Sequence, residues 1–304
     1  MEISNTNNVD VLTSSSMVTD AYFVQYETWL SEQTFTQSTR RNYAAQVRLF
    51  LDFVRHMSPD SPGAAVSLNQ RDMLVEKYTD FLQNSAGACP SSIYQSRTSI
   101  DNFYQFLGLG PSTIERKRYP QKLPRVLTPS EKENFVKALE ASGSTKDKAV
   151  IALFLFAGIR LNECASLDVD DLSITAHTGK LIVCKRKHGR NRELSLDETT
   201  RKAVLAWLIE RSETFPDNSD KALFVNSKGQ RLSHSAVDLI VRKIGIRAGL
   251  VLSAQVLRDT YLADLAQKTQ DIFLVAAIGG CKYLDSARRY FEVASASSES
   301  NIAT

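Results

Sequence analysis

The sequence lacks the patterns by which chains hold metals, form disulfides or cross membranes. Its 304 residues contain four cysteines, Cys89, Cys164, Cys184 and Cys281, and no two of them stand in a C-x-x-C spacing. This argues against a zinc site and a disulfide framework, and scattered thiols are typical of a reducing cytoplasm. The longest apolar run, AVIALFLFAGI at 149–159, is far shorter than the roughly 20 residues that a bilayer requires. We therefore expect a cytoplasmic protein without a membrane partner.

Cofactor motifs are also missing. The sequence has no G-x-x-x-x-G-K-[ST] phosphate loop, and neither a D-D-E nor an H-x-H cluster that would hold a metal. We therefore expect chemistry that needs no metal ion, no ATP and no other cofactor. Charge is nearly balanced, with 37 Lys and Arg against 34 Asp and Glu and a net charge of +3. So small a total does not exclude a nucleic-acid partner, because it can hide a strongly basic face.

The first third of the chain has the spacing of amphipathic helices. Residues 1–18 are polar and predict a flexible leader, whereas apolar residues recur three and four apart from 19 to 109. This pattern predicts a bundle of about four helices without strands. A charged helix face is usually just solvated, but its arginines are also candidates for contacts with DNA phosphates. These candidates are Arg40, Arg41, Arg48 and Arg97, with Arg71 as a further one.

A basic segment with several prolines, 110–127, separates this bundle from the rest of the chain. Its composition predicts an extended strap rather than a buried segment. Thr128, Pro129 and Glu131 then have the order of a helix start, with an N-cap, a proline at the first helical position and a capping glutamate at the third. A second domain is therefore expected over 128–304.

An arginine follows the most apolar stretch of this second domain. The segment VIALFLFAGIR ends in Arg160, and Glu163 follows three residues later. Burying the charge of an arginine is costly unless an anion receives it. That anion is either a phosphate or, within the chain, Glu163 or Asp171, which would make the pair purely structural.

The residues after this arginine alternate in the manner of a small sheet. The stretch LSITAHTGKLIVCKRKHGRNRELSLD predicts three short antiparallel strands. The second turn, at His188-Gly189-Arg190, is crowded by cations that include Lys185 and Lys187. A basic hairpin tip is suited to a DNA groove or a phosphate, although basic residues also serve simply to keep a turn solvated.

A tyrosine stands beside two cations near the carboxyl end. The stretch SARRYFEV places Tyr290 directly after Arg288 and Arg289. Such a tyrosine either fills the edge of a core or acts as a nucleophile near a phosphate. A phenol with its ordinary pKa of about 10 is a weak nucleophile, so the second role needs fixed cations that stabilise the charged transition state.

In their order and spacing, these motifs resemble the tyrosine recombinase, or phage integrase, family over residues 19–292. They are GIRLNEC with Arg160, CKRKHGRNREL with Lys187, VLRDTYLADL with Arg258, and RRYFE with Tyr290. The chain looks like an Xer-type recombinase or a transposon cointegrate resolvase. The resemblance implies a mainly α fold with a small antiparallel β-sheet. A helical core-binding domain at 19–109 and an α+β catalytic domain at 128–304 would close as a clamp around DNA.

The resemblance also implies a site-specific recombinase that cuts and rejoins DNA. Tyr290 would attack a phosphodiester and form a 3′-phosphotyrosyl link, while Arg160 and Arg258 bind the phosphate oxygens. The implied partners are double-stranded recombination sites. A homotetramer would assemble on paired sites and associate only weakly without DNA. In the family, the segment beyond the tyrosine often docks on a neighbouring protomer, and here Phe291, Val293 and Ile302 are the apolar residues that would anchor it.

The acid–base groups depart from the usual set of the family. Lys187 aligns with the lysine that protonates the departing 5′ oxygen, and Lys185 is the alternative; Lys185 and Arg190 are otherwise expected to contact DNA. Gln255 stands where the family usually has a histidine, and Gly280 where it has a second histidine or a tryptophan. We expect Gln255 to donate a hydrogen bond to phosphate, because an amide can do so but cannot shuttle a proton.

Two other functions use the same fold. The absence of both imidazoles favours a catalytically reduced DNA-binding accessory protein, whereas the retained Tyr290, Arg160, Arg258 and Lys187 oppose it. A relaxing topoisomerase that acts as a monomer would share the chemistry of the recombinase. Trapping of a covalent adduct on nicked DNA distinguishes the accessory protein from the enzyme.

Overall fold

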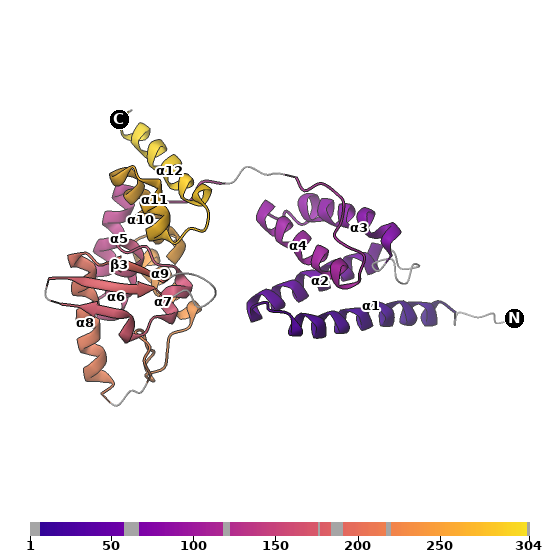
Figure 1. Cartoon of the computed structure of the whole chain (residues 1–304), viewed down its shortest axis with the longest axis horizontal. Coiled ribbons are helices and arrows are strands. Elements are labelled where there is room, and N and C mark those ends of the chain that lie inside the picture. Colours follow the sequence, from indigo (N-terminus) through magenta and orange to yellow (C-terminus); the bar gives the residue numbers. More distant parts are fainter. Residues whose placement is uncertain are drawn as a thin grey trace. The chain divides into compact units, whose positions relative to one another are not determined.

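The structure is a computed structural model that describes residues 7–57, 67–117, 122–175, 177–183, 191–216 and 220–302. The chain divides into two compact units, Met1–Pro120 and Gln121–Thr304 (Figure 1). Each unit has a hydrophobic core of its own. The described residues are mostly helical and contain one small antiparallel sheet, so the predicted fold class is confirmed.

The described residues of the first unit form a bundle of four helices, as the apolar spacing predicts. Its helices are α1 (Asn7–Glu32), α2 (Gln37–Met57), α3 (Leu68–Asp80), which continues into a π-helical turn at Phe81–Ser85, and α4 (Pro90–Phe106). Its core is rich in aromatic rings, and Tyr26 meets Phe103 edge to face with ring centroids 5.2 Å apart. Edge-to-face ring pairs of this kind add to the stabilisation that burial alone provides.

Helix α1 begins earlier than the sequence pattern indicates. It extends back to Asn7, so most of the expected leader at 1–18 belongs to a helix. The physical reason is that nucleation is the costly step of helix formation, whereas each further residue adds a hydrogen bond at little cost. A helix that is nucleated by the buried turns around Tyr26 can therefore propagate into polar sequence.

The expected strap at 110–127 is packed onto the two units over most of its length. In the first unit, Arg71 Nη1 donates to the carbonyl oxygen of Leu109 at 2.6 Å, and Arg97 Nη2 donates to that of Ile114 at 2.8 Å. In the second unit, the backbone N–H of Leu127 donates to Thr260 Oγ1 at 2.9 Å, and the Leu127 side chain is buried. Among the described residues of this segment only Leu127 is buried, so it is an extended strap whose backbone is held by hydrogen bonds to each unit.

The second unit combines helices with the three-stranded sheet. The strand order is β1 (Leu172–Ile174), β2 (Gly179–Val183), β3 (Arg192–Ser195), and both pairings are antiparallel, as predicted. The turn between β2 and β3, with Lys185, Lys187 and Arg190, lies outside the described residues. The helices are α5 (Pro129–Glu140), α6 (Thr145–Leu155), α7 (Leu161–Ser166), α8 (Glu198–Thr214), α9 (His234–Arg247), α10 (Ala254–Thr269), α11 (Ile272–Gly279) and α12 (Leu284–Ile302), with a short 3-10 turn at Val169–Asp171.

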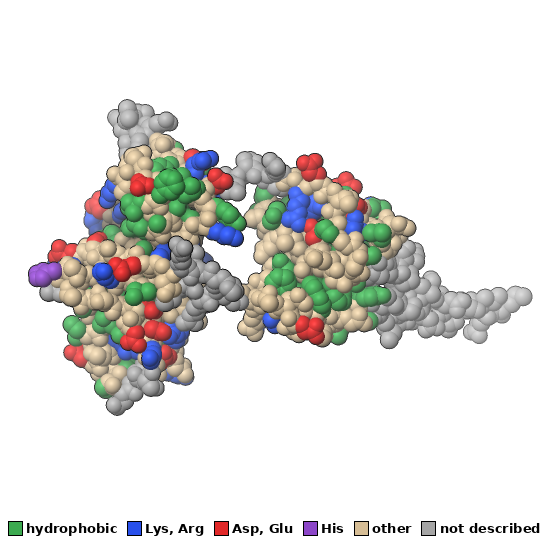
Figure 2. Space-filling view, viewed as in Figure 1, with side chains coloured by type: hydrophobic (Ala, Val, Ile, Leu, Met, Phe, Trp, Pro, Cys, Tyr) green, Lys and Arg blue, Asp and Glu red, His purple; other side chains and the backbone are tan. Residues whose placement is uncertain are grey.

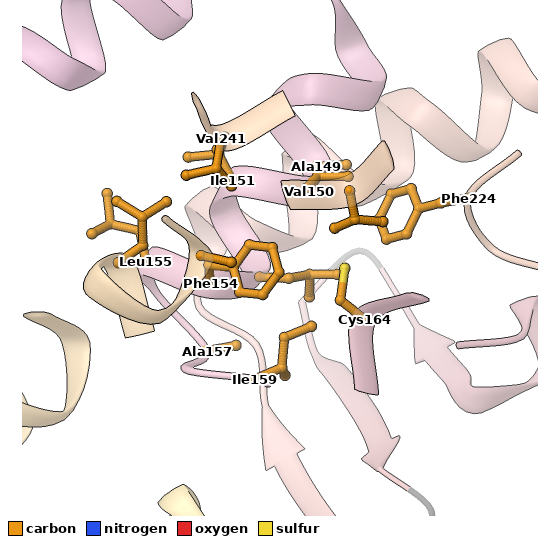
Figure 3. Close-up of a cluster of buried hydrophobic side chains, with 14 of the residues drawn as sticks. Ala149, Val150, Ile151, Phe154, Leu155, Ala157, Ile159, Cys164, Phe224 and Val241 are labelled. Atoms are coloured by element: carbon orange, nitrogen blue, oxygen red, sulfur yellow. The ribbon is translucent and has the colours of Figure 1, made fainter. Parts of the chain in front are cut away.

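Helix α6 runs through the centre of this unit and determines where the site lies. Every side chain from Ala149 to Leu155 is buried, and Figure 3 shows Phe154 and Ile151 packed among residues of other elements, including Val241. The chain leaves α6 through Gly158, which has φ of +63°, and a Cβ there would lie 2.4 Å from the ring of Tyr261. Only glycine fits this turn without strain, and the turn delivers Arg160 to the rim of the core.

None of the helices in the described part of the chain is long and apolar enough to cross a membrane.

The capping box predicted for α5 is present. The hydroxyl of Thr128 accepts from the N–H of Glu131 at 3.2 Å, and a carboxylate oxygen of Glu131 accepts from the N–H of Thr128 at 2.9 Å.

Candidate active site

Arg160 precedes the first turn of α7, and hydrogen bonds from its backbone N–H and its guanidinium hold it in place. Its N–H donates to Glu163 Oε2 at 2.8 Å, its Nη1 donates to Glu163 Oε1 at 2.9 Å, and its Nη2 donates to the carbonyl oxygen of Gly280 at 2.7 Å. The internal pair that the sequence offered as an alternative is therefore formed with Glu163. Asp171 instead accepts from the backbone N–H of Asp168 at 2.9 Å.

Glu163 is shared by two arginines. Arg192, on β3, donates two hydrogen bonds to Glu163, from Nη1 to Oε1 at 2.6 Å and from Nη2 to Oε2 at 2.7 Å. Burial acts to raise the pKa of Glu163, but the hydrogen bonds and charges of Arg192 and Arg160 outweigh it and lower that pKa to about 2. Two guanidinium charges against one carboxylate leave a surplus positive charge, which a phosphate can neutralise.

Arg258 lies on α10 and is buried, with 3% of its surface exposed. Its Nη1 donates to the carbonyl oxygen of Gly158, and its Nη2 donates to that of Gly279 at 2.6 Å. Burial and the charge of Arg160 lower the pKa of Arg258, so the two arginines lie close enough to repel each other. A guanidinium has five N–H donors, so these two bonds leave further donors for a phosphate.

The turn after α11 brings Gly280 against these guanidinium groups. Gly280 has φ of +58°, and a Cβ on it would lie 2.9 Å from Nη1 of Arg160 and of Arg192. The position at which the resembled family usually carries an imidazole or indole is therefore filled here by arginine side chains. A larger residue at position 280 would displace them.

Tyr290 lies on α12 with only 8% of its surface exposed. Its ring packs in a small core with Leu262 and Val275, and its hydroxyl donates to Asp259 Oδ1 at 2.9 Å. Gln255 Nε2 donates to the same oxygen at 2.7 Å, from one turn earlier on α10. The ring of Tyr290 thus fills a core, while its hydroxyl takes part in a buried polar network.

The pKa values of this network follow from its burial. Burial raises the pKa of Asp259, against the opposing hydrogen bonds from Tyr290 and Gln255 and the charges of Arg258 and Arg289. Burial also raises the pKa of Tyr290, with a further rise from the charge of Asp259. The positive charge of Arg258 acts in the opposite direction on the phenol. Tyr290 is therefore a neutral phenol that donates to a carboxylate.

The structure brings together four of the five predicted catalytic residues. Arg160 and Arg192 bond to Glu163, Gln255 and Tyr290 bond to Asp259, and Arg258 lies close enough to Arg160 and Tyr290 for their charges to act on it. The fifth, Lys187, lies outside the described residues, as do Lys185 and Arg190. Among the described residues, no group of three or more histidine, cysteine or acidic side chains is arranged to hold a metal ion.

The predicted phosphate contacts of the first unit separate into two kinds. Arg97 is 4% exposed and donates to backbone carbonyls at 114 and 115, so its proposed DNA contact is corrected to a structural role; Arg71, 7% exposed, is held in the same way. Arg40 is half-buried and donates to the carbonyl oxygens of Gln33 and Phe35. Arg41 and Arg48 are exposed, and Arg48 lies over the ring of Phe23 at 4.8 Å.

Sequence reasoning missed Asp259 and Arg192. Asp259 follows Arg258 directly and lies four residues after Gln255, a spacing that places two side chains on one helix face. Arg192 gave no such signal, because its partner Glu163 is 29 residues away and only the sheet brings the two together.

The comparisons with known proteins agree with this geometry. Residues 125–297 match the model described as the phage integrase family. Tyrosine recombinase XerC of Azotobacter vinelandii is 30% identical over 209 residues, which cover 64% of this chain and 67% of that protein. Tyrosine recombinase XerD of Oceanobacillus iheyensis is 23% identical over 287 residues, which cover 90% and 92%.

Solved structures show the same fold. XerH site-specific recombinase bound to a palindromic difH substrate, in a post-cleavage complex, superposes with a TM-score of 0.71 at 22% identity, over 86% of this chain and 78% of that chain. A lambda integrase tetramer bound to a Holliday junction gives 0.62 at 17% identity, over 89% and 76%. Since the family model spans more than half of the sequence and recombinases of the Xer type are similar along most of it, this chain belongs to the phage integrase family as an Xer-like tyrosine recombinase.

Proposed function

We propose that the protein is a site-specific DNA recombinase that cuts and rejoins DNA through a 3′-phosphotyrosyl intermediate. The observation that carries this proposal is that the Tyr290 hydroxyl bonds to Asp259, the residue next to Arg258, while Arg258 and Arg160 bind the adjacent carbonyl oxygens of Gly279 and Gly280. A nucleophile and two phosphate-binding groups thus meet in one unit. The relatives named as tyrosine recombinases, and the XerH and lambda integrase structures with DNA, support the assignment.

The arginines would stabilise the transition state. When Tyr290 attacks the phosphorus, the pentacoordinate phosphate gains negative charge on its non-bridging oxygens. Arg160 and Arg258 present planar guanidinium groups that are already oriented by carbonyl oxygens, so little reorganisation is needed. The bond between phosphorus and the 5′ oxygen then breaks, and we propose Lys187 as the acid that protonates the leaving oxygen, with Lys185 as the alternative.

Gln255 would contribute from the exposed side of the site. Its side chain is exposed, yet Nε2 is held by Asp259 at 2.7 Å. One of its two amide protons makes this bond, and the other remains for a phosphate oxygen. We therefore propose Gln255 as a neutral phosphate donor in the place of an imidazole.

The two units would have different tasks on DNA. The first unit would bind the duplex as the core-binding domain, with Arg41 and Arg48 as its exposed phosphate contacts, and the second would carry out the chemistry. We propose double-stranded recombination sites as partners and a homotetramer on paired sites. A cytoplasmic location agrees with the free thiols of Cys89, Cys164 and Cys281, and neither a metal nor ATP enters the proposed steps.

A covalent adduct on nicked DNA tests the function. On a substrate whose cleaved end diffuses away, the wild-type protein should form a protein–DNA band that survives denaturation. Tyr290→Phe should abolish this band and leave DNA affinity nearly unchanged, because it removes the nucleophile and no phosphate contact. Tyr283→Phe, at a tyrosine that is 62% exposed, is the matched control and should react normally. A wild-type protein that binds its site but never forms the band would instead be the accessory DNA-binding protein.

A further inference from the structure

One buried carboxylate in the site has no task in the mechanism above. Asp259 is 7% exposed, and within the described residues it forms no ion pair. Its Oδ1 instead accepts hydrogen bonds from the Tyr290 hydroxyl and the Gln255 amide. A buried carboxylate without a contacting cation is costly, and a group that is retained at such a cost next to a nucleophile is a candidate for proton transfer.

We propose that Asp259 is the general base that removes the phenolic proton of Tyr290 during strand cleavage and returns it during rejoining. This proposal rests on the proposed recombinase function. Asp259 touches the reacting oxygen itself, since 2.9 Å separates Oδ1 from the Tyr290 hydroxyl, within the range that proton transfer requires. Gln255 holds the carboxylate oxygen on this side but cannot take up a proton itself.

The proton and electron pairs balance in both directions. In cleavage, the proton of the Tyr290 hydroxyl moves to Asp259, the phenolic oxygen forms a bond to phosphorus, and the bond from phosphorus to the 5′ oxygen breaks. The 5′ oxygen leaves with a proton from the separate acid. In rejoining, a 5′ hydroxyl returns its proton to that separate acid and attacks phosphorus, the bond from phosphorus to Tyr290 breaks, and Asp259 gives its proton back to the phenolic oxygen.

The charges around the pair suit this transfer. The groups that face it are Arg258 on the same helix, Arg289 on α12, and Cys281 in the turn between α11 and α12. Burial raises the pKa of Asp259, which makes its carboxylate a stronger base than a solvated one. The positive charge of Arg258 favours the phenolate that forms as the proton leaves.

Asp259→Asn tests the proposal, because asparagine keeps an oxygen acceptor for the hydroxyl and loses the base. Single-turnover formation of the covalent adduct should slow by at least about 100-fold, the lower range for general base catalysis, with normal DNA binding. Asp264→Asn, on the same helix, is the control and should react at the wild-type rate. Asp264 pairs with Lys132 at 2.6 Å and belongs to no part of the site.

A modified leaving group separates this role from that of the acid. A 5′-bridging phosphorothiolate departs without protonation, so it should rescue Lys187→Ala but not Asp259→Asn. The pH profile gives a second signature. Wild-type cleavage should fall as the pH drops through the pKa of Asp259, which lies above its ordinary 3.8, because a protonated carboxyl cannot accept the phenolic proton. This limb should vanish in Asp259→Asn.

Three results would overturn the proposal. The first is cleavage by Asp259→Asn within about threefold of the wild-type rate. The second is faster cleavage, which would mean that Asp259 holds Tyr290 in an unreactive position, and the third is rescue of Asp259→Asn by the phosphorothiolate. If Asp259→Asn shows no thermal unfolding transition and is therefore not folded, Asp259→Ala is tested instead with added formate, a small carboxylate that can act as the base. Cleavage restored by formate supports Asp259 as the general base, and cleavage that is not restored overturns the proposal. A wild-type protein without any adduct would overturn the proposed function as well, so the two failures are distinguishable.

Discussion

Gln255 shows how a single residue can occupy the position of a missing imidazole. Its amide is exposed at the site and is anchored to Asp259 at 2.7 Å. Gln255→Ala should slow cleavage by the value of one hydrogen bond to a charged group, about 1.5–3 kcal/mol. Single-turnover cleavage rates at saturating protein measure this loss. Gln267→Ala, at an exposed glutamine on the same helix, is the control. Unchanged rates in Gln255→Ala would show that position 255 contributes only packing.

Glu163 links the site to the acid stability of the second unit. Its folded-state pKa is lowered to about 2 from an ordinary 4.5, so its stabilising contribution is present above pH 4.5 and is lost as the pH falls toward 2. This shift corresponds to ~3 kcal/mol in the free energy of unfolding. Urea unfolding of the second unit between pH 6 and pH 2.5 should show a loss of that order.

Glu163→Gln should remove most of this pH dependence, since its side chain does not titrate. Glu133→Gln is the control, because Glu133 is exposed and its partner Lys137 is screened by solvent. An acid-induced loss of stability that is equal in wild type and Glu163→Gln would contradict the assigned cause.

At the scale of elements, the site depends on how α11 ends. Gly280 adopts a left-handed conformation and closes the helix with a bond from its N–H to the carbonyl oxygen of Ala277 at 3.0 Å. Gly280→Ala should cost about 1–2 kcal/mol of stability from backbone strain alone. It should also slow cleavage, because the new Cβ would lie 2.9 Å from the guanidinium nitrogens of Arg160 and Arg192.

Gly249→Ala is the matched control for this substitution. Gly249 follows α9 with a φ of +73°, and nothing lies within 4 Å of a Cβ built on it. Both variants should therefore unfold at similarly reduced temperatures, but only Gly280→Ala should form the covalent adduct slowly. Equal cleavage rates in the two variants would show that the arginines tolerate a methyl group at position 280.

At the scale of the molecule, the segment that follows Tyr290 packs on its own unit rather than forming the docking tail expected from the sequence. Phe291 packs against the core around Tyr290 and Val293 is buried, so neither remains free to anchor a dock on a neighbouring protomer. Helix α12 continues to Ile302. The large apolar side chains exposed nearby belong to α11, the turn after it and the start of α12, where Figure 2 shows hydrophobic residues in green; they are Phe273, Leu274, Tyr283 and Leu284.

Deletion of residues 295–304 tests whether the end of α12 serves assembly. The deletion removes no residue of the site, so binding to a single DNA site should stay near normal. Synapsis of two sites should be impaired, because a small protein surface binds weakly alone and acts only when DNA raises the effective concentration. Gel-shift assays with one-site and two-site DNA measure both. Recombination at the full rate by the truncated protein would show that protomers meet through other surfaces.

The sequence by itself determined the helical bundle, the three-stranded sheet and the α5 capping box. Through its resemblance to a known family it also indicated Arg160, Arg258, Gln255 and Tyr290 as residues of one site. These features follow from local spacing and from motifs, which a linear pattern can carry. The buried face of α2 is an example, since Val47, Phe50, Leu51 and Val54 recur at helical intervals and all are buried.

Only the tertiary structure decided which charged residues are free. Arg97 and Arg41 look alike in the sequence, but Arg97 is enclosed by the 114–115 backbone and Arg41 is exposed. The pairing of Arg192 with Glu163 and of Tyr290 with Asp259 likewise joins residues 29 and 31 positions apart. The physical reason is that a buried polar group must find a partner wherever the fold places one, and that partner is determined by packing in three dimensions rather than by position along the chain.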